Sequence, residues 1–403
     1  MIEYVLEEEE DVMIAIGKRT TKTIAIVSNA FTAGIENEFL LGVAQYAQER
    51  RNIVIRLLHP SDSDMHDSLA DCDGIISWAM QDTAQRLKTT GLPIIDISNI
   101  QPDPDLIGVD VDTARTAVMA AEWFLRRGFR SFAYCGMGVY GFSDTLRDAF
   151  AAATAGCRRE YHVYERWCGK VDASKGSTAR LCRELEAWVS ALPPRTAILC
   201  INDIRANYVL QSCLRVGRAV PDDLAIMGRF NDIAICSTAP VTISSIDVNL
   251  RGLGYTAMRL IESAVEQPVK PKLRPIFRVR PNGVVEREST AVYPVDPPWL
   301  ASALMTLDEN MDRPVSILDL VSAAGVSRPT LQTAFRKAFG MSAGKYILSV
   351  KMREAKRLME QGRFNVKEIA ARTGFATPSY FSKAYHAYYG RAPSSDARRR
   401  DEV

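Results

Sequence analysis

The segment NVKEIAARTGFATPSYFSKAY, residues 365–385, predicts a helix, a glycine turn at Gly374 and a second helix. The same pattern occurs earlier as SILDLVSAAGVSRPTLQTAF, residues 316–335, with its turn at Gly325. The two glycines are 374 − 325 = 49 residues apart. Because each copy is typical of a helix-turn-helix, the doubled pattern predicts a tandem pair of these motifs.

A capping pattern marks the start of the first helix in each copy. Ser316 stands three residues before Asp319, and Asn365 stands three residues before Glu368. Such pairs form the capping box, in which the two side chains bind backbone N–H groups of the first helical turn. The local chemistry therefore supports both helix boundaries.

The second helix of each copy has one apolar and one polar face. Apolar residues at helical spacing predict the core face, namely Leu331, Ala334, Phe335 and Ala338, then Phe381, Ala384 and Tyr385. Side chains able to bind base edges or phosphates lie opposite, namely Arg328, Gln332, Thr333 and Arg336, then Ser379, Ser382, Lys383 and His386. These are either recognition helices or helices of a bundle with one solvated face. The duplication favours recognition helices.

A continuous helix is predicted between the two copies, because Leu348, Met352, Ala355 and Met359 step by four, three and four residues. Such a helix would fix the mutual orientation of the two motifs. Both recognition helices are then expected to enter successive major grooves, about 34 Å apart.

Residues 299 to about 400 resemble the DNA-binding domain of the AraC family of transcription regulators. The matching stretches are 331–340, 351–359, 369–375, 379–382 and 390–393. Thr377 stands where the family has an acid, Tyr385-His386 where it has Phe-Lys, and Asp396 where it has a tyrosine. The resemblance implies an all-α domain with two helix-turn-helix motifs, and it adds Thr377 to the candidate DNA contacts.

The charge of this region agrees with a polyanionic partner. Residues 299–403 hold 17 Lys+Arg and 10 Asp+Glu, a balance of +7; subtraction from the totals of 50 and 48 leaves 33 and 38, or −5, for residues 1–298. The overall charge of +2 thus conceals a basic module joined to an acidic one. A basic domain is the electrostatic footprint of a protein that binds nucleic acid.

The length of 403 residues and the hydrophobic content of 47% predict two or three domains with sizeable cores. No apolar run reaches about 18 residues and no signal-peptide pattern opens the chain, so we expect a cytosolic protein. Residues 1–22, with the acidic run Glu7–Asp11, are expected to form a solvated tail. The eight cysteines lack C-x-x-C spacing, which disfavours a metal site or disulfide framework; we expect them to be reduced and buried.

From residue 23 onward, short apolar runs alternate with amphipathic helices such as 39–50 and 114–127. The runs predict buried strands at 23–28, 53–58, 74–77 and 93–97, then at 130–135, 161–164, 196–201, 224–228 and 243–246. Strands that alternate with helices indicate doubly wound parallel sheets. We therefore predict two α/β lobes in tandem.

Two short motifs in this region have alternative interpretations. Gly136-Met-Gly138-Val-Tyr-Gly141 matches the dinucleotide fingerprint, but it lies in the second lobe, and Phe142-Ser-Asp is expected to add a polar loop before the helix. The favoured interpretation is a glycine-rich loop through which the backbone approaches a ligand. Asp110 and Asp112 could bind a metal, yet such acids more often cap the following helix. We expect no cofactor and no metal.

Residues 23 to about 290 resemble the sugar-binding core of LacI/GalR-type repressors, which is similar to periplasmic binding proteins. The matching residues are at 109–112, 127–130, 147, 202–203, 220–228 and 240–246. The resemblance implies a two-lobed effector domain over 23–291, with lobe 1 at about 23–129 and 246–273 and lobe 2 at about 130–245 and 274–291. The proline-rich stretch 292–298 is the expected linker to the AraC-type domain at 299–403. This combination resembles the regulators of xylose operons.

The same resemblance implies an effector site between the lobes. Arg147 and Asp203 stand where the family contacts its sugar, with Asn29, Trp78 and Asp247 nearby. A guanidinium and a carboxylate can donate to and accept from vicinal hydroxyls. The alternative is that Arg147 and Asp203 pair with each other as a salt bridge.

One departure concerns the identity of the effector. Two residues after Gly228 the family has an acid that binds sugar hydroxyls, whereas this chain has Phe230. Either Asn231 and Asp232 take the role of that acid, or Phe230 stacks on a face of the sugar. The resemblance therefore implies a polyhydroxylated effector without naming the sugar.

The sequence thus predicts a ligand-responsive transcription regulator of a sugar-utilisation operon, which is not an enzyme. By analogy with the family we expect an activator and a homodimer, with promoter DNA, the sugar and RNA polymerase as partners. One alternative is a Rossmann-type nucleotide-dependent enzyme with a helical appendage. Another is an architectural DNA-binding protein that has no effector.

Overall fold

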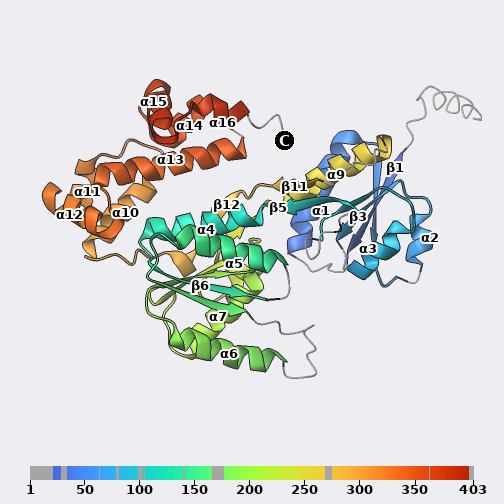
Figure 1. Cartoon of the computed structure of the whole chain (residues 1–403), viewed down its shortest axis with the longest axis horizontal. Helices are drawn as coiled ribbons and strands as arrows, with labels where there is room; N and C mark the ends of the chain where they lie inside the picture. The colour runs from blue at the N-terminus through green and yellow to red at the C-terminus, as the bar shows by residue number, and fades with distance from the viewer. Residues whose placement is uncertain are drawn as a thin grey trace, which may run out of the picture. The chain divides into compact units, whose positions relative to one another are not determined.

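The computed structural model describes residues 21–28, 34–62, 64–78, 81–98, 103, 105–138, 141–165, 177–267, 275–362 and 364–398. The chain divides into two compact units, one formed by residues up to Val111 together with Asn249–Val279, the other by Asp112–Val248 together with the residues from Arg280 onward. The first unit is one α/β lobe. The second unit contains another α/β lobe and the C-terminal helices (Figure 1).

The first unit is built on a six-stranded parallel sheet of order β11-β5-β4-β3-β1-β2. Its strands are β1 (Lys22–Ser28), β2 (Ile53–Leu58), β3 (Gly74–Trp78), β4 (Ile94–Asp96), β5 (Ile107–Val111) and β11 (Ile276–Val279). Its helices are α1 (Ile35–Arg50), α2 (Met65–Leu69), α3 (Gln81–Lys88) and α9 (Leu250–Glu266). Glycines let α1 and α9 approach closely, because a Cβ at Gly42 would lie 2.0 Å from the carbonyl oxygen of Arg251.

The second α/β lobe has a six-stranded sheet of order β12-β10-β9-β8-β6-β7, in which only the pairing of β12 with β10 is antiparallel. Its strands are β6 (Ser131–Gly136), β7 (Glu160–Glu165), β8 (Thr196–Cys200), β9 (Leu224–Arg229), β10 (Ser244–Asp247) and β12 (Gly283–Val285). Its helices are α4 (Thr113–Arg127), α5 (Gly141–Thr154), α6 (Ser177–Ala191), α7 (Asp203–Arg215) and α8 (Ile233–Thr238), with a short 3-10 turn η2 (Glu288–Thr290). Helices α4 and α5 cover one face of the sheet, and α6 and α7 cover the other (Figure 1).

All nine predicted strands are present, with ends shifted by at most one residue, whereas β5, β11 and β12 were not predicted. The chain passes between the lobes after Val111, Val248 and Val279, while the sequence placed these crossings near 129, 245 and 273. The difference arises because α4 packs on the core of the second sheet, and because β11 pairs with β5. Long-range packing, and not local pattern, sets these crossings.

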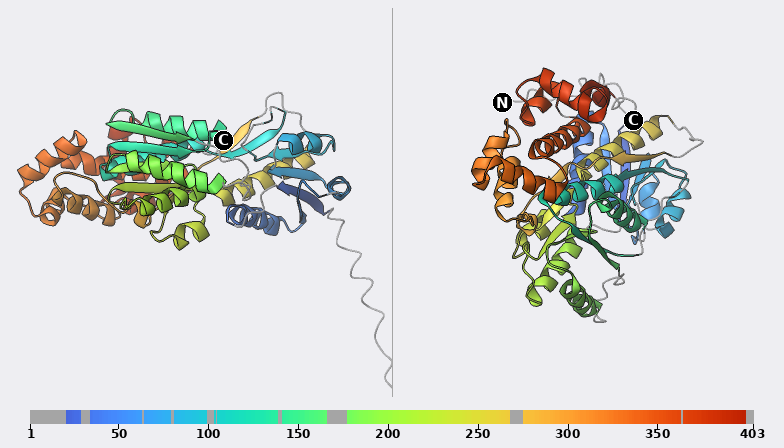
Figure 2. Two further views of the ribbon diagram at one scale, coloured as in Figure 1. Left: turned by 90° about the horizontal axis from the view of Figure 1, so that it is seen from below. Right: turned by 60° about the vertical axis from the view of Figure 1, so that its left-hand side comes forward.

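The C-terminal helices are α10 (Trp299–Glu309), α11 (Ile317–Ala324), α12 (Arg328–Phe339), α13 (Ala343–Gln361), α14 (Val366–Arg372), α15 (Pro378–Tyr389) and α16 (Pro393–Arg398). They form two apolar clusters, one around α10–α12 with the first half of α13, the other around the second half of α13 with α14 and α15. The long α13 belongs to both clusters. The C-terminal helices, coloured orange to red, lie together in both views of Figure 2. Val295, in the expected linker, is buried in the first cluster and Tyr293 packs against that cluster, whereas Asp296 and Pro298 are exposed.

Candidate DNA-binding and effector-binding sites

Both predicted helix-turn-helix motifs are confirmed. Helix α11 ends at Gly325 (φ 62°) before α12, and α14 leads through Gly374 (φ 63°) to α15. Left-handed backbone of this kind costs glycine almost nothing, which explains the residue at each turn. Both capping boxes also form, Ser316 with Asp319 and Asn365 with Glu368.

Helix α12 presents the predicted polar face to solvent. Leu331, Ala334 and Phe335 are buried, while Arg328, Thr333 and Arg336 are exposed. Gln332 is only partly exposed, and its Oε1 accepts a hydrogen bond from the backbone N–H of Ala343 (3.1 Å). Gln332 therefore ties α12 to the start of α13 in this structure, whereas the arginines have their guanidinium groups in solvent.

Helix α15 repeats this arrangement with fewer charges. Phe381 and Tyr385 are buried, and Ser379, Lys383 and His386 are exposed, with Ser382 partly exposed. Thr377 is the N-cap of α15, where its Oγ1 accepts the N–H of Tyr380 (3.1 Å). Tyr380 itself is 61% exposed, three residues before Lys383 on the same face. The sequence analysis did not single out Tyr380, although its place outside the core spacing of this helix is visible in the sequence.

The departures from the AraC pattern at Tyr385 and Asp396 complement each other. The Tyr385 hydroxyl donates to Oδ2 of Asp396 (2.7 Å), and Arg391 pairs with the other carboxylate oxygen of Asp396 (2.7 Å). Burial and the neighbouring carboxylate raise the pKa of Tyr385 above its usual range. The pair therefore holds α16 against the second motif.

The predicted continuous helix between the motifs is confirmed as α13. Met352, Ala355 and Met359 are buried in the cluster of the second motif, and Leu348 packs against it. Lys351 is also buried; its Nζ donates to the carbonyl oxygens of Arg313 (2.8 Å) and Gly374 (3.1 Å). Through Lys351, helix α13 thereby connects the segment before the first motif, at Arg313, with the turn of the second motif, at Gly374.

Asp203, a predicted effector contact, is the first residue of α7, directly after β8. It is 2% exposed, and its oxygens accept hydrogen bonds from Oγ of Ser245 (2.5 Å) and from the backbone N–H of Asp232 (2.7 Å). Burial raises the pKa of Asp203 to about 7, although both hydrogen bonds oppose the shift. A Cβ at Gly228 would lie 2.0 Å from Oδ1, so glycine is required beside this carboxylate.

Arg147, the other predicted contact, lies on α5 within a cluster of acids. Its Nη1 is 2.6 Å from Glu165 and 2.9 Å from Asp144, and its Nε donates to Asp148 (2.8 Å). Asp148 and Glu165 raise the pKa of Arg147 above its usual range. The alternative of an Arg147–Asp203 ion pair does not occur among the described residues, because each group has other partners. Glu165, at the end of β7, was not predicted.

The loop that contains the Phe230 departure has an unusual backbone. Phe230 (φ 97°) and Asn231 (φ 56°) are both left-handed, which costs side-chain-bearing residues energy and often marks functional loops. The buried guanidinium of Arg229 lies 4.5 Å from the centroid of the partly exposed Phe230 ring. The Asn231 Oδ1 accepts from Arg287 (2.7 Å), and Asp232 caps α8. Both of these side chains are thus engaged, and Phe230, Asn231 and Asp232 are all partly exposed.

Three further predicted contacts have different placements. Asp247 is the last residue of β10, and its Oδ2 accepts from Nδ2 of Asn282 (3.0 Å). Trp78 ends β3 in the first unit, where it packs edge-on against Phe39 at 5.3 Å. Asn29 lies outside the described residues. The structure therefore brings Asp203 together with the 230–232 loop. It places Arg147 on α5, paired with Glu165 at the end of β7, and Asp247 at the end of β10.

Gly136, the first glycine of the glycine-rich motif, is the last residue of β6, and residues 139 and 140 of the motif lie outside the described residues. A Cβ at Gly136 would lie 2.8 Å from Oγ of Ser143 and 2.4 Å from the Tyr134 ring. Helix α5 begins at Gly141, so the expected polar loop at Phe142-Ser-Asp is wrong; these residues form the first turn of the helix. Asp112 caps α4 as expected, whereas Asp110 lies within β5.

The seven described cysteines are free thiols; six are buried, and Cys157 is exposed, contrary to expectation. Within the described ranges, no group of three or more His, Cys, Asp or Glu is placed to hold a metal ion. No helix in this part of the chain is long and apolar enough to cross a membrane.

Comparison with known proteins supports a two-domain organisation. A periplasmic binding protein-like domain matches residues 121–290, and a helix-turn-helix domain matches residues 320–399. The Xylose operon regulatory protein of Escherichia coli (strain K12) is 22% identical over 381 residues, which cover 92% of this chain and 95% of that protein.

Two solved structures share the fold. The xylose-binding transcription activator xylR has a TM-score of 0.59 at 21% identity, with 93% of this chain and 97% of that chain covered. A LacI family transcriptional regulator from Enterococcus faecium with bound ribose has a TM-score of 0.53 at 19% identity, with 67% of this chain and 99% of that chain covered.

Proposed function

Since the chain is a DNA-binding transcription regulator that joins a periplasmic binding protein-like domain to an AraC-type helix-turn-helix domain, we propose that it activates a sugar-utilisation operon in response to a small polyhydroxylated effector. These relatives give no support to a nucleotide-dependent enzyme. The names of its relatives mention regulation of a xylose operon, xylose binding and bound ribose. The proposal applies a similar function to this chain.

The observation that carries the DNA-binding part is the pair of capped motifs on one helix. Because α13 is buried in the apolar clusters of both motifs, α12 and α15 keep a defined relative orientation. Each exposes polar side chains on the face opposite to its buried residues, including Arg336 and Lys383. A rigid pair of this kind suits two successive major grooves.

The test uses the full-length chain and a duplex that it selects from random-sequence DNA. Arg336→Ala and Lys383→Ala should each weaken binding, by about 1–3 kcal/mol with altered base preference if the side chain reads a base. If it meets phosphate, the salt slope should fall by about one instead. Arg259→Ala, which removes an exposed cation from α9 in the first unit, is the matched control. Unchanged affinity in both test variants would refute the assignment of these faces.

For the effector, we assign the direct contact to Arg147 and a supporting role to Asp203. The Arg147 side chain is 27% exposed, whereas the Asp203 oxygens are buried and occupied by Ser245 and the N–H of Asp232. Asp203 then holds the loop that presents Phe230 to the sugar, with Asn231, Asp232, Asp247, Trp78 and Asn29 as the remaining candidates. Apolar stacking beside a few polar groups is the usual composition of such sites.

Calorimetric titration with D-xylose and D-ribose tests this assignment. Arg147→Ala should lose about 1.5–3 kcal/mol of affinity, the usual worth of a hydrogen bond to a charged group. Arg215→Ala removes an exposed arginine of the same lobe that pairs with Glu186, and it should leave the affinity unchanged. Full affinity in Arg147→Ala, or an effector that is aromatic or nucleotide-like, would remove the assignment.

The remaining parts of the proposal are the location of the protein, its oligomeric state and its contact with RNA polymerase. The regulator acts in the cytoplasm as a homodimer and contacts RNA polymerase at its promoter. Sedimentation of the full-length chain with and without operator DNA tests the dimer, and in vitro transcription with purified polymerase tests activation.

A further inference from the structure

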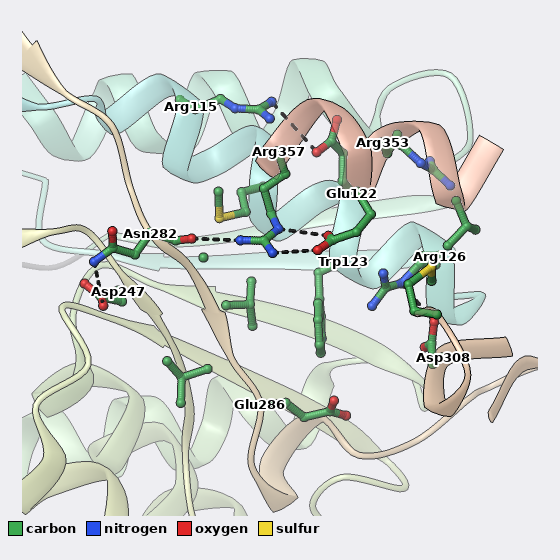
Figure 3. Close-up of a pocket in the computed structure, with 17 residues that line it drawn as sticks. Arg115, Glu122, Trp123, Arg126, Asp247, Asn282, Glu286, Asp308, Arg353 and Arg357 are labelled. Carbon is green, nitrogen blue, oxygen red and sulfur yellow. Dashed lines mark hydrogen bonds and ion pairs between the residues drawn. The ribbon is translucent and has the colours of Figure 1, made fainter. Parts of the chain in front are cut away.

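A pocket of about 460 Å³ separates the second α/β lobe from the C-terminal helices (Figure 3). Arginines and acids of α4, α10 and α13 line it, together with apolar side chains and with Asp247, Asn282 and Glu286. Both walls belong to the second unit. Helix α13 packs in the clusters of both DNA-binding motifs. The pocket lies between this helix and the second α/β lobe, and it leaves room for α13 to move relative to that lobe.

The first half of α13 is anchored to the lobe. Tyr346 is 3% exposed, and its hydroxyl donates to the carbonyl oxygen of Arg126 (2.5 Å). Its ring packs against Phe339, and Arg130 donates to the carbonyl oxygen of Ala338 on the neighbouring α12 (2.6 Å). Apolar burial with satisfied hydrogen bonds makes this end the fixed one.

The second half of α13 reaches the lobe through Arg357. Its Nη1 donates to the carbonyl oxygen of Asn282 (3.0 Å), while its Nε and Nη2 bind Glu354 on the same helix (2.8 and 2.6 Å). Tyr346 and Arg357 are 11 residues apart, about 16 Å along the helix. A displacement at Arg357 thus tilts α13 about the Tyr346 anchor and carries the second motif with it.

Asn282 in turn is bound to Asp247 by two hydrogen bonds. Its Nδ2 donates to Oδ2 of Asp247 (3.0 Å), and its backbone N–H donates to the Asp247 carbonyl (2.9 Å). Asp247 ends β10 just before the chain leaves the second unit after Val248, and Asn282 follows the return of the chain at Arg280. Element-terminal residues at such crossings are the positions that absorb domain movement.

We infer that Asp247, Asn282 and Arg357 form a link that passes the effector-bound state of the lobe to α13 and so to the second helix-turn-helix motif. Arg357 is a positioning residue in this link, because it acts on α13 through its hydrogen bond to the Asn282 carbonyl. The inference rests on the proposed function, because Asp247 is one of the candidate effector contacts. Gly283 lies next to the guanidinium of Arg357, since a Cβ there would be 3.3 Å from Arg357 Nη1.

The experiment measures the ratio of operator affinities of the full-length chain with and without saturating D-xylose or D-ribose. Couplings between two sites commonly amount to 5- to 150-fold. Arg357→Met should reduce the ratio at least fivefold while sugar affinity without DNA stays within about twofold. Arg353→Met is the matched control, because Arg353 lies one turn earlier on α13 and lines the same pocket, but no ion pair or hydrogen bond joins it to a described residue of the lobe. Its ratio should equal that of the parent.

Asn282→Ala provides a second variant on the other side of the pocket. It should reduce the ratio of operator affinities as Arg357→Met does. The double variant should show no further reduction of this ratio, because both groups belong to the same series of contacts. A full ratio in Arg357→Met, or independent losses in the two variants, would overturn the link alone. A parent that binds operator equally with and without sugar would overturn the proposed function and the link together.

Discussion

The buried carboxylate of Asp203 should make the stability of the protein depend on pH in a way that one isosteric substitution removes. Asp203 is 2% exposed, and its pKa is about 7 in the folded chain against an ordinary value of 3.8. An acid whose pKa is raised on folding adds stability that is fully present below the ordinary value and is lost as pH rises through the folded value. The loss therefore falls between about pH 4 and pH 7.

The size of the effect follows from the two pKa values. At about 1.4 kcal/mol per pH unit, the interval from 3.8 to about 7 corresponds to about 4 kcal/mol, of which about 3 kcal/mol falls between pH 5 and pH 8. In Asp203→Asn the side chain cannot ionise, yet its oxygen can accept from the N–H of Asp232 and its amide can donate to Ser245. The variant should therefore gain about 3 kcal/mol relative to the parent from pH 5 to pH 8.

Urea unfolding of both proteins, followed by circular dichroism at pH 5, 6, 7 and 8, measures this difference. Taking the difference cancels the other titrating groups. Asp222→Asn replaces an exposed aspartate of the same lobe and should show no such trend. In Ser245→Ala, the loss of the hydrogen bond that favours the carboxylate should move the transition to higher pH. Parallel stability curves for Asp203→Asn and the parent would refute the reasoning.

Three predictions concern the DNA-binding domain. Met352→Pro should break α13, cost about 3 kcal/mol or more, and abolish the paired footprint while sugar affinity persists; intact protection of both grooves would contradict the rigid linker. Phe381→Ala should cost about 3–5 kcal/mol in urea unfolding because the ring is fully buried, and a loss under about 1 kcal/mol would show that α15 is not held by this core. Burial lowers the pKa of Lys351 to about 8, so the unfolded chain binds the proton more tightly and stability should rise between about pH 8 and 10.5, a trend that thermal melting should find missing in Lys351→Met.

Much of the C-terminal domain could be predicted because its signals are local. Capping boxes, glycine turns and helical spacing each act within one or two turns of a helix, and the AraC-like stretches coincide with them. The polar face of α12 was predicted correctly, but the role of Gln332 as a partner of the Ala343 N–H was not. That bond depends on how α12 packs against α13, which a single helix pattern does not contain.

Most strands of the α/β part were predicted from the sequence, but the positions at which the chain passes between the two lobes were not. The unpredicted strands β5, β11 and β12 are three to five residues long, and two of them pair with partners far away in the sequence. The surroundings of the two main candidate effector contacts, Asp203 and Arg147, were not predicted either. Nothing local shows that Asp203 is enclosed by Gly228 and Ser245, or that Arg147 meets Glu165, because these neighbours come from other strands.

The two DNA-binding motifs are alike in architecture and unequal in charge, and this inequality fits the proposed link. Helix α12 exposes Arg328, Arg336 and Lys337, whereas α15 exposes one lysine, one histidine and several neutral groups. Phosphate attraction falls steeply with salt and holds a protein on any DNA, while neutral donors act mainly at base edges. The motif beside the Tyr346 anchor is thus the one suited to hold DNA, and the motif that Arg357 would move is the one suited to read it. Coupled in this way, the effector would change the choice of site more than the affinity for DNA in general.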